Sequence, residues 1–129
     1  MLGLDSWLVG QVAGTAQAAN VLALSDGSGR IAVAPGCSSW QGMSLALVFW
    51  ATLNQWFRVP LGWRSVAWCA AALAATMAIN VARISAMVLF PSHLQEIHHG
   101  YGWHLSMWLT LATVCGLCLY GSRREVFAR

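Results

Sequence analysis

Three long apolar stretches dominate the chain, at residues 39–57, 65–90 and 102–120. An α-helix rises about 1.5 Å per residue and the hydrocarbon core of a bilayer is about 30 Å thick, so each stretch approaches or exceeds the length that crosses a membrane. The second stretch is longer than a bilayer requires, and Asn80 and Arg83 interrupt its last part. The pattern predicts three transmembrane helices, the second of which ends at or beyond a membrane surface.

The N-terminal residues 1–20 follow a helical repeat instead of forming a continuous apolar stretch. One side of this helix would be formed by Leu4, Trp7, Leu8 and Val12. Asp5 and Ser6 are residue types that cap helix N-termini, and no basic segment precedes them, as it would in a signal peptide. We therefore expect an amphipathic or interfacial helix that begins near Asp5-Ser6.

Residues 21–36 have the layout of a β-hairpin. Two short segments, 21–24 and 30–34, flank a turn that contains Asp26-Gly27, and Asp-Gly supplies the positive φ angles that a tight turn needs. Together these patterns predict an all-α integral membrane protein with about three transmembrane helices in a small bundle, preceded by an amphipathic helix and a short β-hairpin. We treat residues 1–129 as one membrane-embedded domain.

The composition supports a membrane protein. The chain is 58% hydrophobic and 9% charged, whereas a soluble domain has about 25% charged residues. The net charge of +3 is too small to indicate a nucleic-acid partner, so membrane lipid is the expected surroundings. All seven basic residues are arginines, which excludes Schiff-base and Ser-Lys chemistry.

Arginines near the ends of the apolar stretches predict the orientation. If all three stretches cross, five arginines lie on one side, namely Arg58, Arg64, Arg123, Arg124 and Arg129. The positive-inside rule makes that side cytoplasmic. The outer side then receives Cys37, the Arg83 end of the second stretch and the polar loop 91–101. We expect a multi-pass protein of the inner (cytoplasmic) membrane with its site on the outer, periplasmic face.

Cys37 is the cysteine in a polar context, just before the first apolar stretch. There the free N–H groups and the dipole of a helix start would favour an anion such as a thiolate. A free cysteine is often only a small packing residue. A nucleophilic cysteine needs a cation or an imidazole beside it, and the predicted topology brings both types to its side of the membrane.

Arg83 is the charged residue embedded in a long apolar stretch. Exposing it to lipid would cost several kcal/mol, so it faces the protein interior or a cavity, unless it reaches the head groups by snorkelling. Asn80 lies three residues earlier and therefore shares its helical face. The two residues predict a polar patch.

The loop 91–101 and the turn after it contain the four histidines, His93, His98, His99 and His104. No His-Glu-x-x-His is present and the nearby carboxylate is Glu96, so we expect no metal and no other cofactor. Imidazole titrates near neutral pH, which favours a general acid or base for a thiol. The alternative is a wet interfacial loop beside an aromatic belt.

Three motifs in this order resemble the exosortase/archaeosortase family of membrane transpeptidases. They are Gly36-Cys37-Ser38 before a span, Asn80-Val-Ala-Arg83 near the end of the next, and His98-His-Gly-Tyr-Gly102 before the last. The chain departs from the family at Ser39, where Gly is common, and in lacking further N-terminal spans. These departures predict one of three things: a minimal version of the enzyme, a truncated gene product, or a core that pairs with another membrane subunit.

The resemblance implies a polytopic cysteine enzyme that cleaves exported proteins near a C-terminal sorting signal and transfers them to an acceptor. Cys37 would be the nucleophile, His98 would move the proton and Arg83 would stabilise the oxyanion, by analogy with the family. Asn80, Ser38, His99 and His104 would be supporting or alternative site residues.

Two other functions fit the residues. Cys115 and Cys118 form a Cys-x-x-Cys pair, which predicts a membrane thiol oxidoreductase if their helix opens locally. The Trp and Ala content also fits a non-enzymatic membrane subunit or scaffold.

Overall fold

The computed structural model describes residues 2–34, 37–59 and 61–127, and 75% of these residues are helical. Gly36 and Arg129 lie outside the described residues, and the side chains of Arg123 and Arg124 are not described. In chain order the elements are α1 (Leu2–Ala13), β1 (Gln17–Ala18), β2 (Val21–Ala23), β3 (Arg30–Ala32), α2 (Trp40–Trp56), α3 (Trp63–Leu89), the 3-10 turn η2 (Pro91–His93), α4 (Leu94–His99) and α5 (Tyr101–Phe127).

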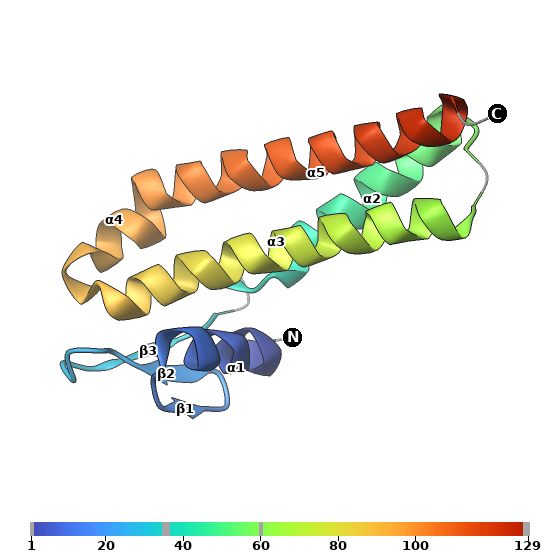
Figure 1. Ribbon diagram of the computed structural model, residues 1–129. Helices are drawn as coiled ribbons and strands as arrows, with labels where there is room; N and C mark the ends of the chain where they lie inside the picture. Colours follow the sequence, from blue (N-terminus) through green and yellow to red (C-terminus); the bar gives the residue numbers. More distant parts are fainter. Residues whose placement is uncertain (1, 35–36, 60, 128–129) are drawn as a thin grey trace.

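Helices α2, α3 and α5 form an elongated bundle, with the short α4 at one end (Figure 1). Small side chains fill the centre of the bundle, where Ala46 of α2, Ala72 of α3, and Val114 and Cys118 of α5 are buried together. The start of α3 is tied to α2 by the indole Nε1 of Trp50, which donates to the carbonyl of Ser65 at 3.1 Å. Small residues let the helix backbones approach closely, as is typical of helices that associate in lipid.

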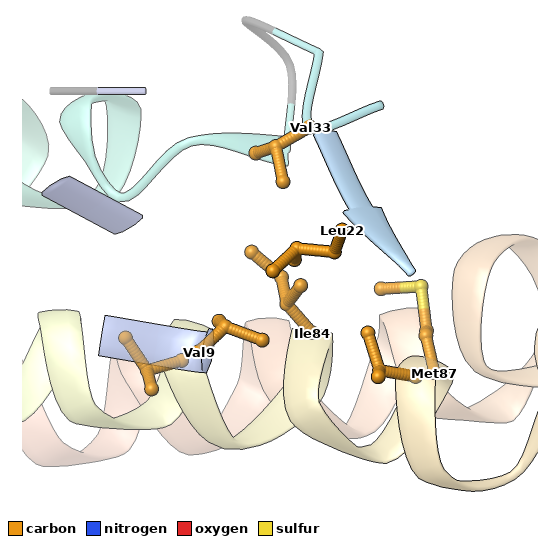
Figure 2. Packing of buried hydrophobic residues seen from close by; sticks show 7 residues of the cluster. Val9, Leu22, Val33, Ile84 and Met87 are labelled. Atoms are coloured by element: carbon orange, nitrogen blue, oxygen red, sulfur yellow. The ribbon is translucent and has the colours of Figure 1, made fainter. Parts of the chain in front are cut away.

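Helix α1 and a three-stranded antiparallel sheet pack on the second half of α3 (Figure 1). Figure 2 shows Val9 of α1, Leu22 of β2 and Val33 beyond β3 gathered against Ile84 and Met87 of α3. The predicted hairpin is present as β2 and β3, with Gly27 at φ +71 in its turn. This small N-terminal unit therefore covers one side of the α3 end that carries Arg83.

Three predicted details are wrong. The N-terminal helix ends at Ala13 instead of near residue 20, and β1 follows it. Asp5 and Ser6 do not cap it, since both lie inside α1 and are fully buried. The segment 91–101 is also not an open loop, because η2 and α4 make most of it helical.

Two helices within the described residues are long and apolar enough to cross a membrane, α3 and the Tyr101–Gly121 part of α5. Large apolar side chains are exposed along α5, including Leu105, Trp108 and Leu109. Helix α2 has 17 residues and is therefore roughly 25 Å long, shorter than a typical hydrocarbon core. The fold is mostly helical, as predicted, and contains two candidate spans, whereas the sequence predicts three.

Gly121 offers a test of the close contact between α3 and α5. A Cβ at this position would lie 2.6 Å from Cγ of Trp68, whereas a Cβ at Gly116 on the same helix meets nothing within 4 Å. We expect Gly121→Ala to lower the free energy of unfolding by about 1–3 kcal/mol. Gly116→Ala should not lower it and should raise it by up to about 1 kcal/mol, because alanine has the higher helix propensity. Denaturant unfolding in detergent micelles, followed by circular dichroism, measures both. Equal midpoints for the two variants would contradict the packing.

Candidate functional site

The Sγ atom of Cys37 lies 3.2 Å from Nε2 of His98. Cys37 belongs to the turn between β3 and α2, and His98 is in the last turn of α4. The helices α2 and α3 separate the two residues in the sequence. Both side chains are half-buried. The structure thus brings the predicted thiol and one particular imidazole into hydrogen-bond contact, at the end of the bundle where α4 lies (Figure 1).

Asn80 holds the Cys37 turn from the side of α3. Its Nδ2 donates to the backbone carbonyl of Cys37 at 2.8 Å and to Oγ of Ser39 at 3.2 Å. The sequence placed Asn80 in a polar patch with Arg83, and the structure gives it a specific task, which is to fix the backbone of the residue that bears the thiol.

Asp5 holds the same turn from the side of α1. Its carboxylate accepts hydrogen bonds from Oγ of Ser38 at 2.8 Å, the backbone N–H of Ser39 at 3.1 Å and Oγ of Ser39 at 2.6 Å. The sequence predicted that Cys37 would use the free N–H groups at the start of α2. Instead, the Ser39 N–H donates to Asp5 and the Trp40 N–H donates to Oγ of Ser38 at 3.3 Å. The Asp5 carboxylate, and not the Cys37 sulfur, therefore accepts from the free N–H at the start of α2.

Arg83 lies close enough to Cys37 and His98 to interact electrostatically with both. Its guanidinium carbon sits 5.1 Å from the ring centroid of Trp103, in a cation–π contact. Its buried Nε donates to no group in the described part of the chain. Arg83 therefore packs against α5 beside Cys37 and His98, with its Nε unpaired among the described residues.

A groove of about 600 Å³ opens beside these residues, between α2, α3 and α5. Ser38, Ser39, Asn80 and Arg83 form its polar end. The rest of the lining is mainly apolar, with side chains such as Leu45, Ile79 and Met107, and includes an amide and a few hydroxyl side chains. Such a groove suits a ligand that is mostly apolar and polar at one end.

The surroundings of His98 favour its neutral form. Burial lowers the pKa of His98 from its ordinary value of 6.5, and the nearby positive charges of His99 and Arg83 lower the pKa further. The ring of His99 packs edge-on against the ring of His98, with centroids 4.1 Å apart. A neutral imidazole can accept the proton of the Cys37 thiol.

The other two histidines do not reach Cys37. His93 pairs with Glu96 at 3.1 Å in an exposed position, and the exposed His104 lies on α5. Within the described residues, no three His, Cys, Asp or Glu side chains group in a way that could hold a metal ion.

Cys115 and Cys118 lie on the uninterrupted helix α5, and all four cysteines are free. The local helix opening that a disulfide between them requires is absent from this described segment. Cys118 packs in the bundle centre with Ala46 and Ala72, so this pair contributes to helix packing.

The structure brings together Cys37, Asn80, Arg83 and His98, which the sequence proposes as site residues, and adds Asp5, which the sequence does not indicate. Comparisons with protein-family models, with curated proteins and with solved structures found no match to this chain. The geometry itself supports proton transfer from a thiol to an imidazole beside a guanidinium with a free donor.

Alkylation of Cys37 by iodoacetamide should depend on His98. We expect the rate to rise with pH through the pKa of His98, with a midpoint below 6.5, because only neutral His98 accepts the thiol proton. His98→Ala should remove this rise and react on the order of tenfold more slowly at pH 7, while His104→Ala should match the wild type. Peptide-resolved mass spectrometry separates Cys37 from the other cysteines. A His98→Ala profile identical to the wild type would rule out the pairing.

Proposed function

We propose that this protein is a membrane cysteine transpeptidase or protease that cleaves exported proteins near a C-terminal sorting signal through a thioacyl intermediate. The observation that carries the proposal is the 3.2 Å contact between Cys37 Sγ and His98 Nε2, with Arg83 beside both. The order of the three motifs, which resembles that of exosortases and archaeosortases, supports the same activity.

The chemistry follows from the three side chains. Cys37 Sγ attacks the scissile carbonyl carbon while His98 Nε2 takes the thiol proton, and the Arg83 guanidinium donates to the oxygen that becomes negative. Collapse of this intermediate breaks the C–N bond, and His98 returns the proton to the leaving amine. An amine acceptor that attacks the thioester gives transpeptidation, and water gives hydrolysis.

The groove provides a place for the substrate. In this proposal its apolar part between α2 and α5 contacts one side of the membrane-embedded segment of a sorting signal. Its polar lining includes Arg83 and the two serines that follow Cys37, and this part faces the preceding peptide. In this proposal α2, α3 and α5 all cross the inner membrane. The 17 residues of α2 lie at the lower end of the range for transmembrane helices. Arg58 and Arg64 then face the cytoplasm and the site faces the periplasm.

Processing in the native host tests the activity. We expect Cys37→Ala to leave exported proteins with their C-terminal apolar segments attached, because no thioester can form. Mass spectrometry of C-terminal peptides from membrane fractions measures this. Hydroxylamine, which cleaves thioesters, should release acyl hydroxamates from the wild type and none from Cys37→Ala.

The Cys115→Ala/Cys118→Ala double variant is the matched control and should process substrates normally. The reverse pattern would indicate the thiol oxidoreductase. Normal processing in Cys37→Ala, Arg83→Ala and His98→Ala alike would leave the non-enzymatic subunit or scaffold.

Labelling of intact cells tests the orientation. A membrane-impermeant maleimide should label Cys37 from outside, whereas Arg64→Cys in a Cys37→Ser background should react only after permeabilisation. The exposed Arg64 lies in the first turn of α3, at the opposite end of that helix from Arg83. The opposite labelling pattern would reverse the topology.

A further inference from the structure

Asp5 is a buried carboxylate that contacts the site without touching its reacting atoms. It is 0% exposed, and it lies inside α1, a helix that the sequence indicates only as an interfacial segment. Its three hydrogen bonds all come from Ser38 and Ser39, the two residues that follow Cys37. Burying a carboxylate costs several kcal/mol unless strong hydrogen bonds offset the cost. The hydrogen bonds to Asp5 therefore fix the conformation of the turn formed by Cys37, Ser38 and Ser39.

Two polar side chains hold that turn from opposite elements. Ser39 Oγ donates to Asp5 and accepts from Asn80 Nδ2, and Asn80 also fixes the Cys37 carbonyl. The chain Asn80–Ser39–Asp5 thus connects α3 to α1 through the residue that precedes α2. A charged acceptor strengthens such bonds, because hydrogen bonds to carboxylates are shorter and stronger than neutral ones.

Asp5 also occupies the N-terminus of α2, where partial positive charge favours an anion. The N–H of Ser39 donates to its Oδ2. An asparagine amide replaces the carboxylate only in part, because one of the two acceptor oxygens becomes an NH₂ group and one or two of the three donors lose their acceptor.

We propose that Asp5 is a positioning residue for Cys37. Its carboxylate holds the Cys37-Ser38-Ser39 turn so that Sγ stays within hydrogen-bond distance of His98 Nε2. This inference rests on the proposed function in one respect, that Cys37 is the nucleophile. Helix α1 then has two roles, because it positions the Cys37 turn and covers one side of α3.

The test compares Asp5→Asn with Asp26→Asn in the full-length protein in detergent micelles. Asp26 is a matched control, because its exposed carboxylate also accepts bonds from a serine, Ser28, in the hairpin turn. The probe is iodoacetamide, and the readout is the Cys37 alkylation rate from pH 5 to 8. We expect Asp5→Asn to react at least about tenfold more slowly at pH 7 and to lose the rise through the His98 pKa, since small displacements of reacting groups are costly. Asp26→Asn should behave like the wild type.

A milder variant guards against misfolding. Ser38→Ala removes one of the three bonds and should slow alkylation by a smaller factor, with helical content unchanged by circular dichroism. A wild-type alkylation rate and pH profile in folded Asp5→Asn would overturn the positioning role. A lower yield of Asp5→Asn would also overturn it if the folded fraction keeps the wild-type profile, because Asp5 would then act on folding alone. If wild-type Cys37 reacts no faster than Cys37 in His98→Ala, the proposed nucleophile itself fails, which is a distinct result.

Discussion

The packing of the second half of α3 against α1 and the sheet is the contact on which the site depends. Val81, Ile84 and Val88 face this small apolar core, which leaves the polar face of the same turns, Asn80 and Arg83, toward α2 and α5. The serine of the hairpin turn adds to this attachment, because the Ser25 N–H donates to the carbonyl of Val88 at 3.2 Å. Helix α3 therefore presents Asn80 and Arg83 to the site on one face. On another face it binds α1 and the sheet, and α1 carries the Asp5 that holds the Cys37 turn.

The sequence predicted the elements whose signals are local. Long apolar stretches marked α3 and α5, Asp-Gly marked the β2–β3 turn, and counting crossings placed Cys37, Arg83 and His98 at one end. These signals work because helix length, turn conformation and chain direction are properties of short segments. The choice of His98 over its neighbour His99 came from motif spacing, and the 3.2 Å contact with Cys37 agrees with it.

The remaining part of the site could not be predicted, because it depends on tertiary partners. In the sequence, Asp5 resembles a helix cap. No residue near it in the chain indicates that Ser38 and Ser39 donate hydrogen bonds to its carboxylate. The two-residue strand β1 and the short helix α4 are likewise stabilised by what they pack on, and short elements carry weak periodic signals. A buried polar residue is the kind of feature that hydrophobic patterns hide.

The charges around Cys37 constrain how the proposed reaction would start. Asp5 places a negative charge behind the thiol-bearing turn, and Arg83 places a positive charge beside His98. The positive charge of Arg83 disfavours a second positive charge on His98, whose pKa is already lowered by burial. His98 is therefore favoured in the neutral form that can accept the Cys37 proton. In the proposed reaction the new oxyanion accepts a hydrogen bond from the Arg83 guanidinium, which offsets its negative charge while His98 becomes protonated.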